Sequence, residues 1–77
     1  MPEVLRFGKC KICVYADEHG APHFHIRGPG WEVKCDTRTF AIIAGDGPRA
    51  NVQEGLKLAA ENQAELLRVW SEQNDRD

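Results

Sequence analysis

Residues 22–36, PHFHIRGPGWEVKCD, decide the fold of this chain. Two short runs in which apolar and polar residues alternate, roughly His23 to Arg27 and Trp31 to Asp36, lie on either side of Gly28-Pro29-Gly30. Alternation with a period of two is typical of a strand with one buried face, and glycine and proline between two such runs mark a turn. The stretch therefore predicts an antiparallel hairpin.

The register of this hairpin follows from its apolar residues. Pairing Phe24 with Val33 and Ile26 with Trp31 keeps the apolar side chains together, whereas a slip of one residue would place each of them opposite a polar one. This pairing predicts a four-residue loop, residues 27–30. The same register predicts these polar pairs on the opposite face: His23 with Lys34 and His25 with Glu32.

The same alternation extends the sheet in both directions. Strands are predicted at roughly Glu3 to Phe7 and Cys10 to Ala16, joined by Gly8-Lys9, where glycine in the first position suits a type II′ turn. Charged residues, glycine and proline predict a loop over residues 17–22. The run from Phe40 to Ala44 predicts a fifth strand, apolar enough to be covered on both faces. The whole pattern is typical of an antiparallel meander.

Helical periodicity replaces the alternation after Gly45-Asp46-Gly47-Pro48. Residues 48–73 predict an amphipathic helical segment with Pro48 at its first position and Asp46 or Gly47 as its cap. Asn62 followed three residues later by Glu65 resembles a capping box, which predicts a break near Asn62 and two helices in place of one. The apolar stripe consists of Val52, Leu56, Ala59, Ala60, Leu66, Leu67 and Trp70.

These elements predict an α+β fold. An antiparallel meander of four or five strands, about residues 3–44, is followed by one long or two short C-terminal helices, about residues 48–73, packed on one sheet face. At 77 residues the chain is expected to form a single domain, residues 1–77. With 42% hydrophobic and 29% charged residues, the composition is that of a folded protein and excludes the disordered class.

Charge and hydropathy exclude further classes of partner. The net charge of −2 and the pI of about 5.9 provide no basic field, so the sequence does not support binding of nucleic acid. No apolar run is long enough to span a membrane, and the first residues lack the pattern of a signal peptide. We therefore expect a cytoplasmic protein with no membrane partner.

The three cysteines, Cys10, Cys13 and Cys35, are expected to be reduced thiols, because an odd number in a chain without a secretion signal argues against a disulfide framework. Cys10 and Cys13 have the spacing C-x-x-C. On a strand, residues three apart project to opposite faces, so Cys10 is predicted to face the core and Cys13 the other side. The pair therefore does not predict a shared metal or redox site.

One face of the predicted sheet is left without a helix. If the helical segment covers the side that carries Phe24 and Ile26, the odd-numbered residues of that strand project to the other side. His23 and His25 then lie together on the uncovered face. The candidate binding surface on this face consists of Tyr15, His23, His25, Arg27, Glu32 and Lys34.

Two interpretations of this face are chemical. His23 and His25 with Glu32 form a two-histidine, one-carboxylate set that suits iron, zinc or manganese, although no motif identifies the third ligand. Alternatively, a histidine acts as general acid or base beside Tyr15 and Glu32 in a nuclease or hydrolase reaction, with a basic residue of the same face steadying a phosphodiester. No residue stands out as a nucleophile. His23, His25 and Glu32 are thus candidate catalytic residues, and the two histidines are candidate metal ligands.

The third interpretation, which we favour, is docking to another protein. A short sheet covered on one side leaves two edges and one face, and a small chain is stabilised by burying them against a partner or a second copy. Tyr15 among charged residues is typical of a contact patch. The residues therefore predict a protein–protein interaction module, with a protein partner or a homodimer and no cofactor. They favour a role without enzymatic activity and leave the nuclease or hydrolase interpretation open as the alternative.

Four segments resemble a known family: MPEVLRFGKCKICVYADEHGAPHFHI, WEVKCD, IIAGDGPRA and ENQAELLRVW. Together they are similar to the small bacterial family called domain of unknown function 4160, from Pro2 to Trp70. The most distinctive match is Pro22-His23-Phe24-His25, after an acidic loop with Asp17 and Glu18. The resemblance implies a product of a small operon, encoded beside another short protein, and with it a component of toxin–antitoxin type. Cys10 and Cys13 match no hallmark of the family.

Overall fold

The computed structural model describes residues 3–16 and 20–74, so Asp17, Glu18 and His19 of the predicted loop lie outside the described residues. Five strands are followed by two helices. Their bounds are β1 Glu3–Phe7, β2 Cys10–Cys13, β3 His23–Gly28, β4 Trp31–Asp36, β5 Ile42–Asp46, α1 Arg49–Glu61 and α2 Gln63–Asn74.

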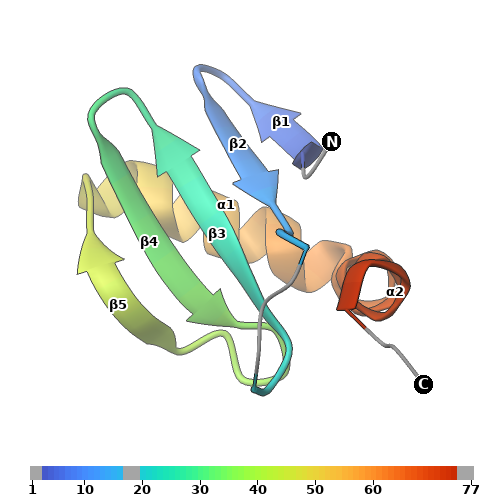
Figure 1. The fold of residues 1–77 in the computed structure, drawn as a ribbon. Helices are drawn as coiled ribbons and strands as arrows, with labels where there is room; N and C mark the ends of the chain where they lie inside the picture. Colours follow the sequence, from blue (N-terminus) through green and yellow to red (C-terminus); the bar gives the residue numbers. More distant parts are fainter. Residues whose placement is uncertain (1–2, 17–19, 75–77) are drawn as a thin grey trace.

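The strands form one sheet in the order β1-β2-β3-β4-β5, and every neighbouring pair is antiparallel. This is the predicted meander, followed by the predicted C-terminal helices. Helix α1 crosses one face of the sheet, and α2 turns away at its end, beside the end of β2 (Figure 1). The fold class predicted from the sequence is therefore confirmed.

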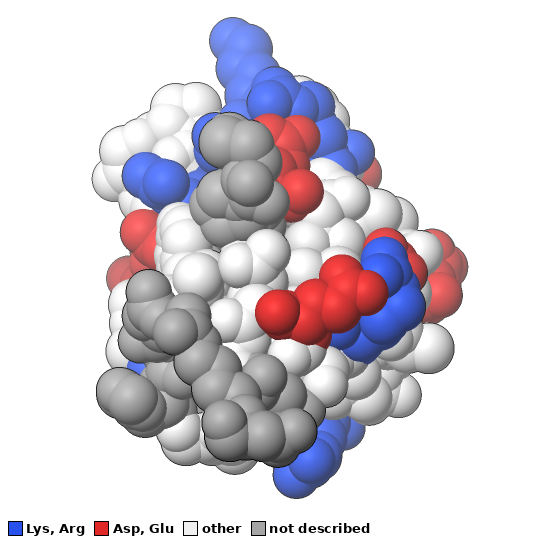
Figure 2. Space-filling view, turned by 45° about the vertical axis from the view of Figure 1, so that its right-hand side comes forward, with Lys and Arg blue, Asp and Glu red and all other residues white. Residues whose placement is uncertain are grey.

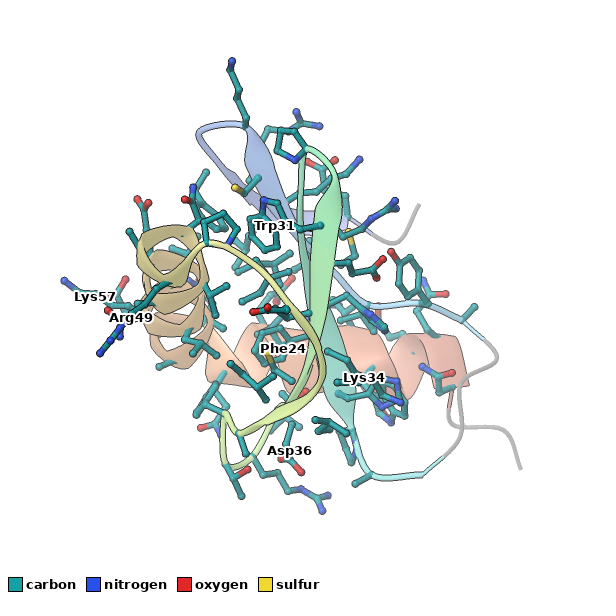
Figure 3. The ribbon with its side chains drawn as sticks, turned by 90° about the vertical axis from the view of Figure 1, so that its left-hand side faces the viewer. Phe24, Trp31, Lys34, Asp36, Arg49 and Lys57 are labelled. Carbon is teal, nitrogen blue, oxygen red and sulfur yellow. The ribbon has the colours of Figure 1, made fainter. Side chains whose placement is uncertain are left out.

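The core lies between the sheet and the helices. Phe24 and Ile26 are fully buried on the side of α1, whereas Lys34 projects to the side away from α1 (Figure 3). The prediction that even-numbered residues of β3 face inward is thus confirmed. The buried core consists of Ile12, Val14, Phe24, Ile26, Val33, Cys35, Val52, Ala59, Leu66 and Trp70.

The register of the β3–β4 hairpin differs from the prediction by two residues. Ile26 lies opposite Val33, and Gly28 belongs to β3 opposite Trp31, so the predicted four-residue loop is wrong. The turn is Pro29-Gly30, and the φ of 80° at Gly30 matches the third position of a type II turn. The physical reason is the Trp31 ring, which lies so close to Gly28 that a Cβ there would be 2.3 Å from Trp31 Cε2. A shift of two residues preserves which face each side chain occupies.

The first hairpin forms around the predicted turn at Gly8-Lys9. Leu5, Arg6 and Phe7 lie opposite Ile12, Lys11 and Cys10, respectively. Gly8 has a φ of 55°, the positive value that the first position of a type II′ turn requires. An irregularity in the pairing between Glu3 and Leu5 places Glu3 opposite Cys13.

The prediction for the fifth strand is wrong in its bounds and in its burial. β5 begins at Ile42 instead of Phe40, and all its residues are exposed. Phe40 lies in the preceding turn with a φ of 64°, and its N–H donates to the carbonyl of Asp36. Because the meander places β5 at the end of the sheet, one of its edges has no neighbouring strand among the described residues. Apolar composition alone did not distinguish an exposed edge from a covered centre.

The helical segment breaks at Asn62, as predicted. Asn62 has φ −126° and ψ 30°, which ends α1. The predicted capping box does not form, because Asn62 Nδ2 donates to the Leu58 carbonyl (2.9 Å) and Glu65 pairs with Arg68. At the other end, Pro48 is the residue before the helix and not its first residue, and no side chain caps α1.

The helices are too short and too polar to cross a membrane: no helix among the described residues is long and apolar enough to do so.

Candidate functional site

The polar face of the sheet is arranged in rows that run across the strands. Because directly paired residues project to the same face, each row brings together side chains from distant parts of the sequence. Glu32 lies one row away from His25, within reach of a diagonal contact. One row contains Lys11, Arg27 and Glu32, and the next contains Cys13, His25 and Lys34.

Glu32 is the centre of a polar network. His25 Nδ1 lies 2.9 Å from Glu32 Oε2, and Arg27 Nε lies 3.6 Å from Glu32 Oε1. The predicted contact between His25 and Glu32 is therefore present, but it runs diagonally, since the residue directly opposite His25 is Lys34. Likewise, His23 lies opposite Asp36 and not Lys34. A carboxylate that accepts from a ring N–H holds the imidazole in one orientation.

Tyr15, two residues after the end of β2, completes the network. Its hydroxyl accepts a hydrogen bond from Arg27 Nη1 (3.2 Å) and donates to Glu32 Oε2 (3.4 Å), and its ring lies 4.5 Å from the His25 ring between centroids. Burial and then the charges of Cys13 and Glu32 raise the pKa of the Tyr15 phenol. The hydrogen bond that Arg27 donates to Tyr15 raises the pKa of Arg27. Both groups therefore stay protonated at neutral pH, and Tyr15 keeps its O–H for donation.

His23 is set apart from the rest of the candidate surface. It is only 3% exposed, and its ring lies 4.6 Å from the Trp70 ring of α2. Its Nδ1 lies 3.0 Å from the carbonyl oxygen of Ala21, and its ring centroid is 5.5 Å from that of His25. The sequence places both histidines on one face, and the structure agrees, but α2 covers His23.

Sequence reasoning missed the two residues of α2 that reach this face. Trp70 was interpreted only as a core residue, and it is one, but it also packs on His23. Asn74 donates from Nδ2 to the Tyr15 carbonyl oxygen (3.0 Å), which ties the end of α2 to the segment that carries the network. Helical periodicity marks Trp70 as buried but does not say which sheet residue it covers.

Cys13 lies beneath the polar face and opposite His25. It is buried, and burial raises the pKa of its thiol. Cys10 faces α1 instead, where Asn51 Nδ2 donates to its sulfur (3.6 Å). The prediction that the two cysteines face opposite sides is confirmed, and all three cysteines are free thiols.

The metal interpretation lacks a ligand set in the described part of the chain. No three histidine, cysteine, aspartate or glutamate side chains of residues 3–16 and 20–74 lie together in a way that could hold a metal ion. Of the three candidate ligands, His25 and Glu32 contact each other, whereas the ring of His23 packs against Trp70.

Charged side chains of both signs lie on the face of the molecule shown in Figure 2. On the side shown in Figure 2, positive and negative side chains lie next to each other, without one large patch of a single sign. On α2, for example, Arg68 forms ion pairs with both Glu65 and Glu72, and these hydrogen bonds raise its pKa.

Comparison with known proteins identifies a family but no activity. No curated protein and no solved structure matches the chain. The family described as a domain of unknown function (DUF4160) matches over residues 10–71, a span that contains the polar network and the cover of His23 by α2. The resemblance stated from the sequence is thereby confirmed. The chain belongs to the DUF4160 family.

Proposed function

We propose that this protein is a protein–protein interaction module, the partner component of a small toxin–antitoxin type or operon-encoded pair. The observation that carries the proposal is the preassembled network of Tyr15, His25, Arg27 and Glu32, on the sheet face that α1 leaves uncovered. Lys34 adds a cation to the same face.

Preassembly favours binding because the side chains lose little freedom when a partner arrives. Tyrosine and arginine are the residue types that most often dominate binding energies at interfaces, together with tryptophan. The side chains of Arg27 and Glu32 are 46% and 39% exposed, so each keeps atoms that a partner can reach. A polar partner surface that presents a carboxylate to Arg27 and a cation to Glu32 would match them.

The test uses the protein encoded beside this one in the genome. We expect a complex by isothermal titration calorimetry, and we expect Arg27→Glu and Glu32→Lys to weaken it at least about tenfold, which corresponds to about 1.4 kcal/mol. The matched control for Arg27→Glu is Arg68→Glu, an equal change of charge on the exposed face of α2. Absence of a complex, or an equal loss in the control, would contradict the proposal.

A second candidate function rests on the 2.9 Å contact between His25 Nδ1 and Glu32 Oε2. If Glu32 accepts the Nδ1 proton, the lone pair of His25 is on Nε2, the arrangement of a general base. Arg27 stands beside it to meet an anion such as a phosphodiester. The enzyme hypothesis expects His25→Ala to abolish cleavage of an RNA oligonucleotide without changing the oligomeric state. The docking hypothesis expects the same variant to fold, to show no loss of turnover and to bind its partner more weakly.

A further inference from the structure

The edge of β5 that has no neighbouring strand among the described residues exposes apolar side chains. Ile42 and Ile43 are 51% and 53% exposed, and they are the exposed large apolar side chains among the described residues. Edge strands present unpaired N–H and C=O groups to solvent, so an apolar edge readily accepts another strand.

The opposite edge of the same sheet provides an internal comparison. β1 carries the ion pair of Arg6 with Glu3 (2.8 Å), and charges on an edge disfavour pairing with another strand. In β5 the only charged residue is Asp46, at its end. The two edges of one sheet therefore differ in charge, and β5 is the edge without a charged side chain before its last residue.

The isoleucines project to the side of the sheet that α1 covers. Ile42 lies opposite Cys35 and Gly45 opposite Val33, both buried core residues, and Ile43 is two residues before Gly45. An irregularity in the β4–β5 pairing thus brings Ile42 and Ile43 to the same side. The apolar layer of the core therefore continues past α1 to the edge of the sheet.

A cavity of about 320 Å³ lies beside this edge, between β5 and α1. Its apolar walls come from Val33, Ile42, Val52 and Leu56, and Asp46 and Arg49 also line it. Its volume is in the lower range of ligand pockets, and it is large enough to receive apolar side chains from a neighbouring strand.

We propose that a second copy of this chain occupies the edge, through antiparallel pairing of β5 with β5. This dimer uses a different surface from the polar network and goes beyond the proposed function. A two-fold axis keeps the covered faces of both sheets on the same side, so the isoleucines of the two copies meet and continue one apolar layer. The pairing would join two five-stranded sheets into one continuous sheet.

The charges of β5 suit self-pairing. In an antiparallel pair the two Asp46 carboxylates lie at opposite ends, so like charges stay apart. With Ile43 opposite Ile43 of the second copy, each Asp46 approaches residues 37–40 of the other chain, the turn that carries the exposed Arg38. No charged side chain lies in the middle of the strand to oppose the contact.

The test measures the oligomeric state by sedimentation velocity and light scattering over a range of concentrations. We expect a concentration-dependent dimer for the natural chain, and at least a tenfold weaker association for Ile43→Lys. The matched control is Ala60→Lys, which adds the same charge at an exposed position of α1. Circular dichroism reports whether each variant folds.

Hydrogen exchange of the natural chain provides a readout that does not depend on a variant. We expect the amides of residues 42–46 to become more protected as the concentration rises, while those of β1 do not change. A chain that stays monomeric up to about 1 mM would overturn the proposal, since this concentration corresponds to only about 4 kcal/mol of binding energy. A dimer that survives Ile43→Lys, or protection at residues 42–46 that needs a different protein, would overturn it too.

The two proposals fail separately. Arg27→Glu is expected to leave the β5 dimer intact and to weaken the complex with the partner protein. Ile43→Lys is expected to do the reverse.

Discussion

Asp36 holds the turn between β4 and β5 with its side chain. Its Oδ1 accepts hydrogen bonds from the backbone N–H groups of Arg38 (2.7 Å) and Thr39 (3.0 Å). The bonds from Thr39 and then Arg38 lower the pKa of Asp36 below its ordinary value. This turn sets the entry into β5, so a single carboxylate influences where the exposed edge begins.

We predict that Asp36→Ala lowers the free energy of unfolding and that the loss depends on pH. Because the pKa is lower in the folded state, the stabilisation is present above the unfolded pKa and disappears as the pH falls through the folded pKa. Urea unfolding at several pH values should therefore show the difference between the natural chain and the variant shrinking toward about pH 2. Asp36→Asn is the control, since it keeps the acceptor oxygen and loses the charge.

Cys35 has the opposite dependence on pH. It is fully buried in the core, and burial raises the pKa of its thiol from 9.0 to about 11. The folded chain therefore keeps the proton at a pH where the unfolded chain loses it, so stability is fully present below about pH 9 and falls as the pH rises toward 11.

We predict a loss on the order of 2 to 3 kcal/mol in the free energy of unfolding by about pH 11, relative to neutral pH, from this thiol. Cys35→Ala should be less stable at neutral pH, because it leaves a small cavity, but its stability should fall less steeply in this range. Chemical unfolding at pH values from about 7 to 11 measures both slopes. If the free energy of unfolding falls equally steeply with pH in the natural chain and in Cys35→Ala, the thiol of Cys35 does not cause the loss.

Helix α1 approaches the sheet closely at Gly55. A Cβ at this position would lie 2.8 Å from Ile26 Cδ1 and 3.1 Å from Phe7 Cζ, so neighbouring side chains would have to move. Glycine weakens an isolated helix by about 1 kcal/mol relative to alanine, and here the close packing of helix on sheet offsets that cost. α1 can lie this close to β3 because residue 55 has no Cβ.

We predict that Gly55→Ala lowers the free energy of unfolding by about 1 kcal/mol, because overpacking by about 1–3 kcal/mol outweighs the gain in helix propensity. Gly55→Val should lose more. Glu54→Ala, on the exposed side of α1, is the control and should change stability by less than about 0.5 kcal/mol. Equilibrium urea unfolding compares the three variants. If Gly55→Ala is more stable than the natural chain, the neighbouring side chains of the sheet move to make room for the Cβ, and the prediction is wrong.

The two helices contact different faces of the sheet. α1 covers the apolar face of the sheet (Figure 1). α2 contacts the polar side through Trp70 on His23 and Asn74 on the Tyr15 carbonyl. The break at Asn62 allows this change of direction. Stability of the fold and access to the polar face are therefore linked through α2.

We predict that Trp70→Ala lowers the free energy of unfolding by about 3–5 kcal/mol, a large part of the stability of a small domain. It should also make His23 react faster with diethyl pyrocarbonate, because the indole no longer covers the imidazole. Arg68→Ala, whose side chain is exposed on the same helix, should leave both the unfolding free energy and the reaction rate almost unchanged.

Those features of the fold that depend on local patterns were predictable. Alternation with a period of two is a property of neighbouring residues, and it correctly places Phe24 and Ile26 in the core and His25 on the polar face. The break at Asn62 and the glycine turn at Gly8 also follow from local preferences. The contact between His25 and Glu32 was predicted for the same reason, although by a different register.

The sequence by itself therefore determined the order of the elements and the face on which the residues of β3 and β4 lie, because both follow from the geometry of a single strand or helix. Only the tertiary structure decided the register at Gly28, the exposure of β5 and the cover of His23 by Trp70. These depend on which distant side chains meet: the indole of Trp31 fits over a residue without a Cβ, and a meander leaves its last strand at an edge. Contacts between residues far apart in the chain are set by packing in three dimensions, and no local period encodes them.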